Sequence, residues 1–215
     1  MLAFSDEERE RIKQAVQQAE RRTTGEIVPM IVPASARYRE AGYRTGLILG
    51  WLTLAMLLTI ETAWLPWGWH GGNAGWLLFA VIAAYGVGEW LGTFPRVIRA
   101  VTSRERMAFK VKLRAEQAFY QHGFHQTQGR TGILILISLL EHRVHVLADK
   151  GIHDCVPGGT WEGMVGGIIE GIKIGRPTDA ICAAIARCGA LLATTCPSGT
   201  SDNPDELPDD LIEEP

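Results

Sequence analysis

The chain has 215 residues, of which 47% are hydrophobic, and a formal net charge of −3, values typical of a single soluble domain. The charge is spread unevenly, however. Residues 45–95 carry two charged side chains, Glu61 and Glu89, whereas the other 164 residues carry 43. Six of the seven tryptophans also lie within residues 45–95. An apolar insert of this length excludes a simple soluble protein.

The first 44 residues predict one helix followed by one strand. Ser5 opens a capping box, with a glutamate three residues later, and apolar residues at helical spacing follow. A strand is expected over residues 26–33, where Pro29 favours a sheet edge or a strand start. One helix and one strand cannot build a core. We therefore expect residues 1–44 and residues 96–196 to fold together as one domain.

Residues 46–65 and 75–94 predict two membrane-spanning helices. Each stretch has 20 residues, about 30 Å as a helix, which matches the hydrocarbon thickness of a bilayer. Most of the tryptophans lie near the ends of the stretches, and indole rings favour the headgroup level. The alternative is a pair of helices buried in a soluble core, but core helices of this length rarely have so few charges. We expect a transmembrane hairpin over residues 45–95, inserted after the first strand.

The orientation of this hairpin follows from its flanks. The connecting turn has no lysine or arginine, whereas basic residues precede the first span and follow the second. The positive-inside rule then predicts cytoplasmic termini and a cytoplasmic domain, and the acidic N-terminus does not resemble a signal peptide. The basic stretch after the second span also suits anionic lipid headgroups. The flanking residues are Arg37, Arg39, Arg44, Arg96, Arg99, Arg104, Arg106, Lys110, Lys112 and Arg114.

Small residues recur every four positions at the inner ends of both spans and permit close helix packing. The pairing is either within the hairpin or between two copies of the chain, which makes a homo-oligomer a further expectation. Glu89, beside this strip, is either a functional intramembrane carboxylate or a side chain that reaches the inner interface. The small residues are Gly42, Gly46 and Gly50 in the first span and Ala84, Gly88 and Gly92 in the second.

The segment after the hairpin predicts a helix-covered sheet. Pro177 and Thr178 indicate a helix stop followed by an N-cap. Gly163, Gly167 and Gly171 either lie flat on the sheet or pack against another helix, with Gly175 as the helix cap. The fold class is therefore α/β with a mixed sheet. Helices are expected at residues 103–122, 160–174 and 178–195, and strands at residues 132–139 and 144–148.

Residues 197–215 form an acidic tail with seven acidic residues and no basic one. Its prolines and few apolar side chains predict a disordered or loosely docked segment. It is either a solubilising terminus or an interaction peptide.

Candidate chemistry is confined to polar residues around the two C-terminal strands. The four cysteines have no paired metal-ligand spacing, and no phosphate-binding loop or nucleophile motif is present. Imidazoles and carboxylates can hold a divalent metal that activates water for phosphoester hydrolysis. We expect no cofactor beyond such a metal and no nucleic-acid partner. The candidate catalytic residues are Asp149, Glu141 and His125, and the candidate metal ligands are His142, His145, Asp149 and Asp154.

Three segments together share a pattern with a known family. They are Thr24-Gly25-Glu26-Ile-Val with Ser35 and Tyr38; the run from His125 through Thr127, Arg130, Ser138, Glu141 and Val144 to Asp149 and Ile152; and the tail from Asn203 to Asp209. These segments resemble the TPM domain family, particularly its bacterial membrane members, and the resemblance covers roughly 150 residues of the two soluble halves. It implies an α/β/α sandwich at the bacterial inner membrane.

The resemblance also implies a phosphatase activity, which is reported for plant relatives with an acidic, metal-binding site. Many of those relatives carry an Asp-Asn/Lys-Gly-Val turn before the central strand. This chain has Gln128-Gly-Arg130-Thr-Gly132 there, so one carboxylate is missing. We therefore expect an accessory protein that binds partner proteins at the membrane, with a metal-assisted phosphatase as the alternative.

Overall fold

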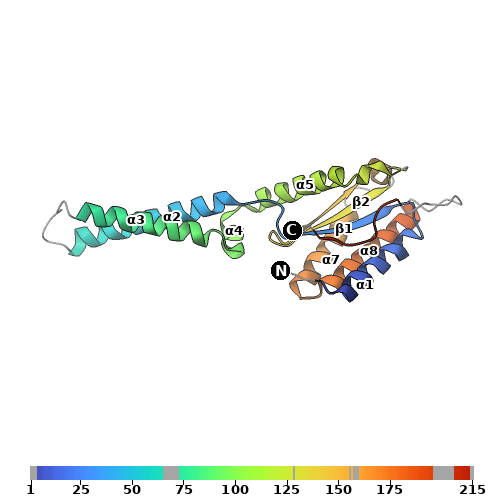
Figure 1. Ribbon diagram of the computed structural model, residues 1–215, viewed down its shortest axis with the longest axis horizontal. Coiled ribbons are helices and arrows are strands. Elements are labelled where there is room, and N and C mark those ends of the chain that lie inside the picture. Colours follow the sequence, from blue (N-terminus) through green and yellow to red (C-terminus); the bar gives the residue numbers. More distant parts are fainter. Residues whose placement is uncertain are drawn as a thin grey trace. The chain divides into compact units, whose positions relative to one another are not determined.

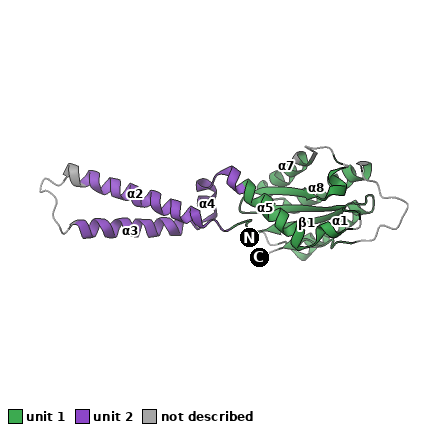
Figure 2. Cartoon of the chain, turned by 90° about the horizontal axis from the view of Figure 1, so that it is seen from above, with its two compact units in different colours: residues 1–36, 108–215 green, residues 37–107 purple. Residues whose placement is uncertain are grey.

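The computed structural model describes residues 4–64, 73–127, 129–154, 156, 160–195 and 206–213. The chain divides into two compact units (Figure 2). Unit 1 consists of residues 1–36 and 108–215, and unit 2 of residues 37–107. Unit 2 extends beyond the expected insert of residues 45–95, because its first helix begins before the apolar stretch and a short helix that follows the second span packs against it.

Unit 1 contains a mixed four-stranded sheet in the order β3-β2-β1-β4. β1 pairs in parallel with β2 and with β4, and β2 pairs antiparallel with β3. The α/β class and the mixed sheet are therefore confirmed. The strands are β1 (Glu26–Val32), β2 (Gly132–Ser138), β3 (Arg143–Ala148) and β4 (Ile212–Glu213).

The two faces of the sheet support two separate hydrophobic cores. Side chains alternate along a strand, so the isoleucines of β2 enter one core and its leucines enter the other. Three helices cover the first face, and α5 with the short helix η1 covers the second, which gives three layers (Figure 1). The covering elements are α1 (Asp6–Glu20), α7 (Thr160–Lys173), α8 (Pro177–Thr195), α5 (Arg104–Gln121) and η1 (Phe124–Gln126).

The helix starts show one confirmed expectation and one difference. Ser5 and Glu8 form a complete capping box at the start of α1. At α8, however, Pro177 is already helical, because its fixed φ and missing N–H suit the first helical position. Thr178 is therefore not an N-cap residue. Its hydroxyl instead donates a hydrogen bond of 2.7 Å to Glu8 Oε1 and ties α8 to α1.

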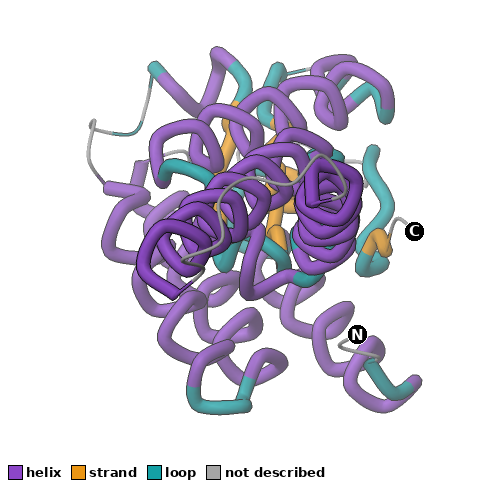
Figure 3. The backbone as a smooth tube through the Cα atoms, turned by 90° about the vertical axis from the view of Figure 1, so that its left-hand side faces the viewer, coloured by secondary structure: helices purple, strands orange, loops and turns teal. Residues whose placement is uncertain are grey.

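The acidic tail contributes to the sheet. β4 pairs with β1 at Met30 and Ile31, and Figure 3 shows a short strand beside the label of the C-terminus. Of the two alternatives expected for the tail, disorder or docking, residues 206–213 show docking, because Leu207, Leu211 and Ile212 pack against the two cores. The charge and proline content of the tail gave no indication that these three apolar side chains are enough to dock it.

Unit 2 is built on an antiparallel pair of long helices, α2 (Arg39–Trp64) and α3 (Asn73–Leu91), followed by α4 (Pro95–Val101). The glycines of the seam pack within the hairpin: a Cβ on Gly88 or on Gly92 would lie 2.7 Å or 2.4 Å from the Cα of Gly46 or Gly42. Of the two alternatives for the small-residue strips, the structure thus shows pairing between the two helices of one chain.

Candidate functional site

Glu141 occupies the turn between β2 and β3 and is 5% exposed. Its Oε1 accepts the backbone N–H of Ser35 at 3.0 Å, and its Oε2 accepts the hydroxyl of Ser138. Ser35 in turn donates to Ser138 Oγ at 2.8 Å. This network joins the segment that leaves β1 to the end of β2. Glu141 therefore acts as a buried anchor for the backbone at this end of the sheet.

His142 and His145 lie on either side of the start of β3 but in different surroundings. His142 is exposed in the turn with φ 50°, a left-handed conformation that few non-glycine residues adopt. His145 is half-buried on the sheet face that α5 covers. Burial and the nearby Lys112 lower the pKa of His145, and Glu116 opposes the shift. The two imidazoles do not share a site.

Asp149 lies at the opposite end of β3 from Glu141. β3 has six residues, a rise of about 20 Å. Asp149 caps the short helix α6 (Lys150–His153) by accepting the Lys150 N–H at 2.7 Å. Its backbone N–H donates to Gly132 O at 2.9 Å. The remaining oxygen, Oδ2, is buried and makes no hydrogen bond within the described part of the chain.

His125 lies at the same end of the sheet as Asp149. Gly132, the first residue of β2, contacts both Asp149 and Phe124, the neighbour of His125. A Cβ on Gly132 would lie 2.2 Å from the carbonyl oxygen of Phe124. The backbone at Phe124 therefore packs closely against the start of β2. Nδ1 of His125 is buried without a hydrogen-bond partner among the described residues. The imidazole ring packs against the ring of Tyr120, with 5.2 Å between the two centroids. Asp154, at the end of α6, is exposed.

The candidate metal ligands are therefore spread over both ends of β3 and one sheet face. Among the side chains that the structure describes, no three of His, Cys, Asp or Glu are grouped so that they could hold a metal ion. The described residues therefore do not fit the divalent metal that the sequence pattern implied.

A carboxyl cluster that was not expected lies where the tail meets β1. Glu20 Oε1 accepts the backbone N–H of Ile27 at 2.6 Å, and Glu26, 3% exposed, accepts the Leu207 N–H at 3.3 Å. Asp209, 8% exposed, accepts a hydrogen bond of 2.9 Å from the side chain of Gln17. Its other oxygen is buried without a partner in the described structure. Three carboxyl groups thus meet at one edge of the sheet.

The crowding of these carboxyl groups favours a protonated acid. Burial raises the pKa of Glu20 to about 9, the negative charges of Glu26 and Asp209 add to the shift, and the Ile27 hydrogen bond opposes it. At neutral pH, Glu20 therefore carries a proton beside Asp209. On α8, burial and the charge of Glu20 raise the pKa of the Cys188 thiol to about 12, which makes this thiol unreactive.

Ion pairs with α1 hold the rest of the tail at the same edge. Lys13 Nζ lies 3.0 Å from Asp210 Oδ1, and Arg9 Nε lies 2.9 Å from Glu213 Oε1. All four side chains are partly exposed, so each pair stabilises the docked tail only weakly. Sequence could not reveal the carboxyl cluster, because the tail residues in it lie 181 and 192 residues from Glu26 and Gln17, which they contact. The only local signal was the apolar pair Leu211-Ile212 between acidic residues.

The most extensive exposed apolar surface of the described residues is that of α2 and α3. Both helices are long and apolar enough to cross a membrane, and 11% and 6% of their most apolar windows are buried. A core helix of a soluble protein would be mostly buried instead. Large side chains that are at least half exposed point outward along both helices: Tyr43, Leu47, Ile48, Trp51, Leu52, Met56, Trp76, Leu78, Phe79, Ile82, Val87 and Trp90.

The fold and this surface together define an α/β protein with a pair of membrane-length helices. No family model matches the chain, and no curated protein matches it. Among solved structures, the chain is similar to the NMR structure of the BA42 protein from the psychrophilic bacterium Bizionia argentinensis. The two share 19% sequence identity with a TM-score of 0.61, over 100% of this chain and 98% of that chain. At this identity the similarity concerns the fold alone.

Proposed function

We propose that this chain is an integral membrane protein whose α/β unit is a TPM-like accessory domain that binds partner proteins during the maintenance of membrane complexes. The observation that carries this proposal is the apolar surface of α2 and α3, which is exposed along its length. In water such a surface would aggregate, whereas in a bilayer it meets acyl chains. The three-layer arrangement of unit 1 supports the TPM-like assignment.

The positive-inside rule supports a two-pass arrangement in a bacterial inner membrane, with both termini in the cytoplasm. Arg44 and Arg106 belong to the basic flanks, and both side chains are exposed. They lie near the first and the last residue of unit 2, away from the turn that connects α2 to α3. Cysteines in right-side-out spheroplasts should therefore stay unlabelled by a membrane-impermeant maleimide until the membrane is permeabilised. Labelling of intact spheroplasts would contradict this orientation.

The outer face of α5 is the surface of unit 1 best suited to a protein partner. Phe109, Leu113 and Tyr120 follow one another at helical spacing and are 63%, 48% and 66% exposed. The opposite face of α5 packs on the sheet through Val111 and Ala115. Lysines and arginines flank the apolar stripe, and exposed apolar patches with a polar rim are typical of protein interfaces.

Affinity purification in mild detergent tests this function. We expect the full chain to retain specific membrane proteins, and a Phe109→Ser, Leu113→Ser variant to lose them. Ile174→Ser is the matched control, because Ile174 is equally exposed, at 64%, but follows α7 on the other face of the sheet. Recovery of the same partner proteins with the wild-type chain and with the Phe109→Ser, Leu113→Ser variant would contradict a role for the outer face of α5.

The alternative of a metal-assisted phosphatase has its own outcome. Metal-dependent hydrolysis of a generic phosphoester by the purified chain, abolished by Asp149→Ala, would overturn the accessory role. Under the accessory role, we expect neither turnover nor a change in partner binding in that variant.

A further inference from the structure

A groove runs along one side of the seam between α2 and α3. The closest approaches set the register, because Gly42 lies against Glu89, Gly46 against Tyr85 and Gly50 against Val81. From Gly42 to Gly50 the seam spans eight residues, about 12 Å. The small glycines bring the helices together here and leave the flanking side chains to form the walls of the groove.

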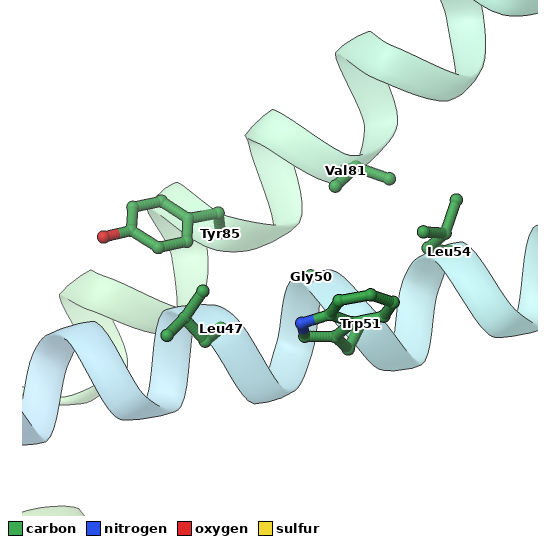
Figure 4. A pocket seen from close by; sticks show the side chains of 6 residues that line it. All are labelled: Leu47, Gly50, Trp51, Leu54, Val81 and Tyr85. Atoms are coloured by element: carbon green, nitrogen blue, oxygen red, sulfur yellow. The ribbon is translucent and has the colours of Figure 1, made fainter.

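The part of the groove farther from the chain ends of unit 2 is apolar. It is a cavity of about 200 Å³ lined by Leu47, Gly50, Trp51 and Leu54 of α2 and by Val81 and Tyr85 of α3 (Figure 4). In Figure 4 the side chains of Leu47 and Trp51 lie on α2 across from those of Tyr85 and Val81 on α3. Its dimensions and apolar lining suit a segment of an acyl chain.

The part of the groove near the start of α2 and the end of α3 contains charged and polar side chains. It is a cavity of about 360 Å³ whose lining includes Arg39, Tyr43, Glu89 and Thr93. Arg39 and Glu89 carry opposite charges and line the same cavity, yet neither makes an ion pair or hydrogen bond with another described residue. The cavity therefore presents one cation and one anion that are separated from each other.

The two cavities lie on the same side of the seam. Tyr43, Leu47 and Trp51 each directly follow a seam glycine, so they share one edge of α2. On α3 the corresponding wall residues recur every four positions, a spacing that keeps them on one helix face. The two cavities therefore follow one another along the seam, one lined by charged side chains and the next by apolar ones, the order in which a phospholipid presents its headgroup and its acyl chains. The wall residues are Val81, Tyr85 and Glu89 of α3, followed by Thr93 in the turn after the helix.

We propose that this groove binds a zwitterionic phospholipid of the ethanolamine type, with its phosphate at Arg39, its ammonium group at Glu89 and an acyl chain in the apolar cavity. Charge complementarity selects this occupant. A guanidinium pairs well with phosphate, and a carboxylate accepts hydrogen bonds from a primary ammonium. An anionic glycerol headgroup offers Glu89 only neutral hydroxyl donors, and its net negative charge would be repelled by this carboxylate. This inference rests on the proposed membrane location.

Native mass spectrometry of the detergent-purified full chain tests the proposal. The protein is titrated with phosphatidylethanolamine and phosphatidylglycerol that carry the same acyl chains. We expect a preference of about tenfold for phosphatidylethanolamine, in line with one charge-assisted hydrogen-bonded contact. Glu89→Gln should remove that preference, and Arg39→Gln should weaken the binding of both lipids.

Glu105→Gln is the matched control, because Glu105 is exposed at the start of α5 and does not line the groove. Circular dichroism checks that each variant keeps its helices. Equal binding of the two lipids by the wild-type chain, or an unchanged preference in Glu89→Gln, would overturn the proposal. Extraction of cell membranes with alkaline carbonate separates the two failures. A chain that is released has no membrane location at all, whereas a chain that stays in the membrane without the lipid preference lacks only the groove site.

Discussion

The carboxyl group of Glu20 accepts the backbone N–H of Ile27 at 2.6 Å, beside the stretch of β1 that β4 does not pair. Because β4 pairs only at Met30 and Ile31, this side chain replaces a missing strand. Pro29, two residues farther along, has no N–H to satisfy on the same side. The prediction that Pro29 marks a sheet edge or a strand start is therefore wrong, because Pro29 lies within β1 and β1 lies between β2 and β4. Proline is tolerated here because β4 does not pair with β1 at Pro29.

Glu20 should make the stability of unit 1 depend on pH. Its pKa is raised to about 9 from 4.5 in the folded chain, so the native state holds a proton that the unfolded state releases. The stabilisation is fully present below about pH 4.5 and is lost as the pH rises toward about 9, by at most tenfold in the unfolding constant per pH unit. The urea midpoint of the detergent-solubilised chain, measured from about pH 5 to about pH 8.5, should therefore fall.

Glu20→Gln isolates this effect. The amide keeps an oxygen that can accept the Ile27 N–H but has no proton to lose, so the decline between those pH values should flatten. Glu10→Gln is the control, because Glu10 is exposed on the same helix and only accepts a local hydrogen bond from Gln14. An identical pH profile for wild-type and Glu20→Gln would show that Glu20 is not the titrating group.

Glu141 should matter for folding. Glu141→Ala leaves the Ser35 N–H and the Ser138 hydroxyl without their acceptor in a buried site, which should lower the free energy of unfolding by about 1–3 kcal/mol. Equilibrium denaturation measures this loss. Glu116→Ala, which removes an exposed ion pair of 3.8 Å with Lys112 and a negative charge near His145, should cost less than about 0.5 kcal/mol. Equal effects of the two variants would argue against the anchor.

The seam of the hairpin should tolerate no side chain at Gly92. A Cβ on Gly92, directly after α3, would lie 2.4 Å from the Cα of Gly42, whereas a Cβ on Gly86 within α3 meets nothing within 4 Å. Gly92→Ala should destabilise the helix pair by about 1–3 kcal/mol, and Gly86→Ala should be neutral or slightly stabilising. The midpoint of sodium dodecyl sulfate titration, followed by circular dichroism in micelles, compares them. Similar midpoints for both variants would contradict the observed register.

Local patterns in the sequence predicted local structure well. The capping box at Ser5, the apolar run of β2 and the long helices of the hairpin each follow from neighbouring residues. The separation of Glu141 from Asp149 could also have been derived, because the two residues precede and follow β3, and a strand carries its ends apart. Glu141 and Asp149 therefore cannot belong to one site, because the length of β3 separates them.

Long-range contacts could not be predicted in this way. Docking of the tail depends on contacts such as Lys13 with Asp210 and Gln17 with Asp209, whose partners are separated by almost the entire chain. The high pKa of Glu20 has the same origin, since two of the charges around it belong to other elements. Composition left the acidic tail either disordered or loosely docked, because it does not record which basic and apolar side chains the tail contacts.

Fluorescence quenching by phospholipids with brominated acyl chains tests the membrane location most directly. Six of the seven tryptophans lie within residues 45–95, and Trp51, Trp76 and Trp90 are exposed on α2 and α3. In vesicles that contain these lipids, we expect the full chain to lose most of its tryptophan fluorescence relative to vesicles of unbrominated lipid. Equal fluorescence in the two kinds of vesicle would show that α2 and α3 do not enter the bilayer and would contradict the account.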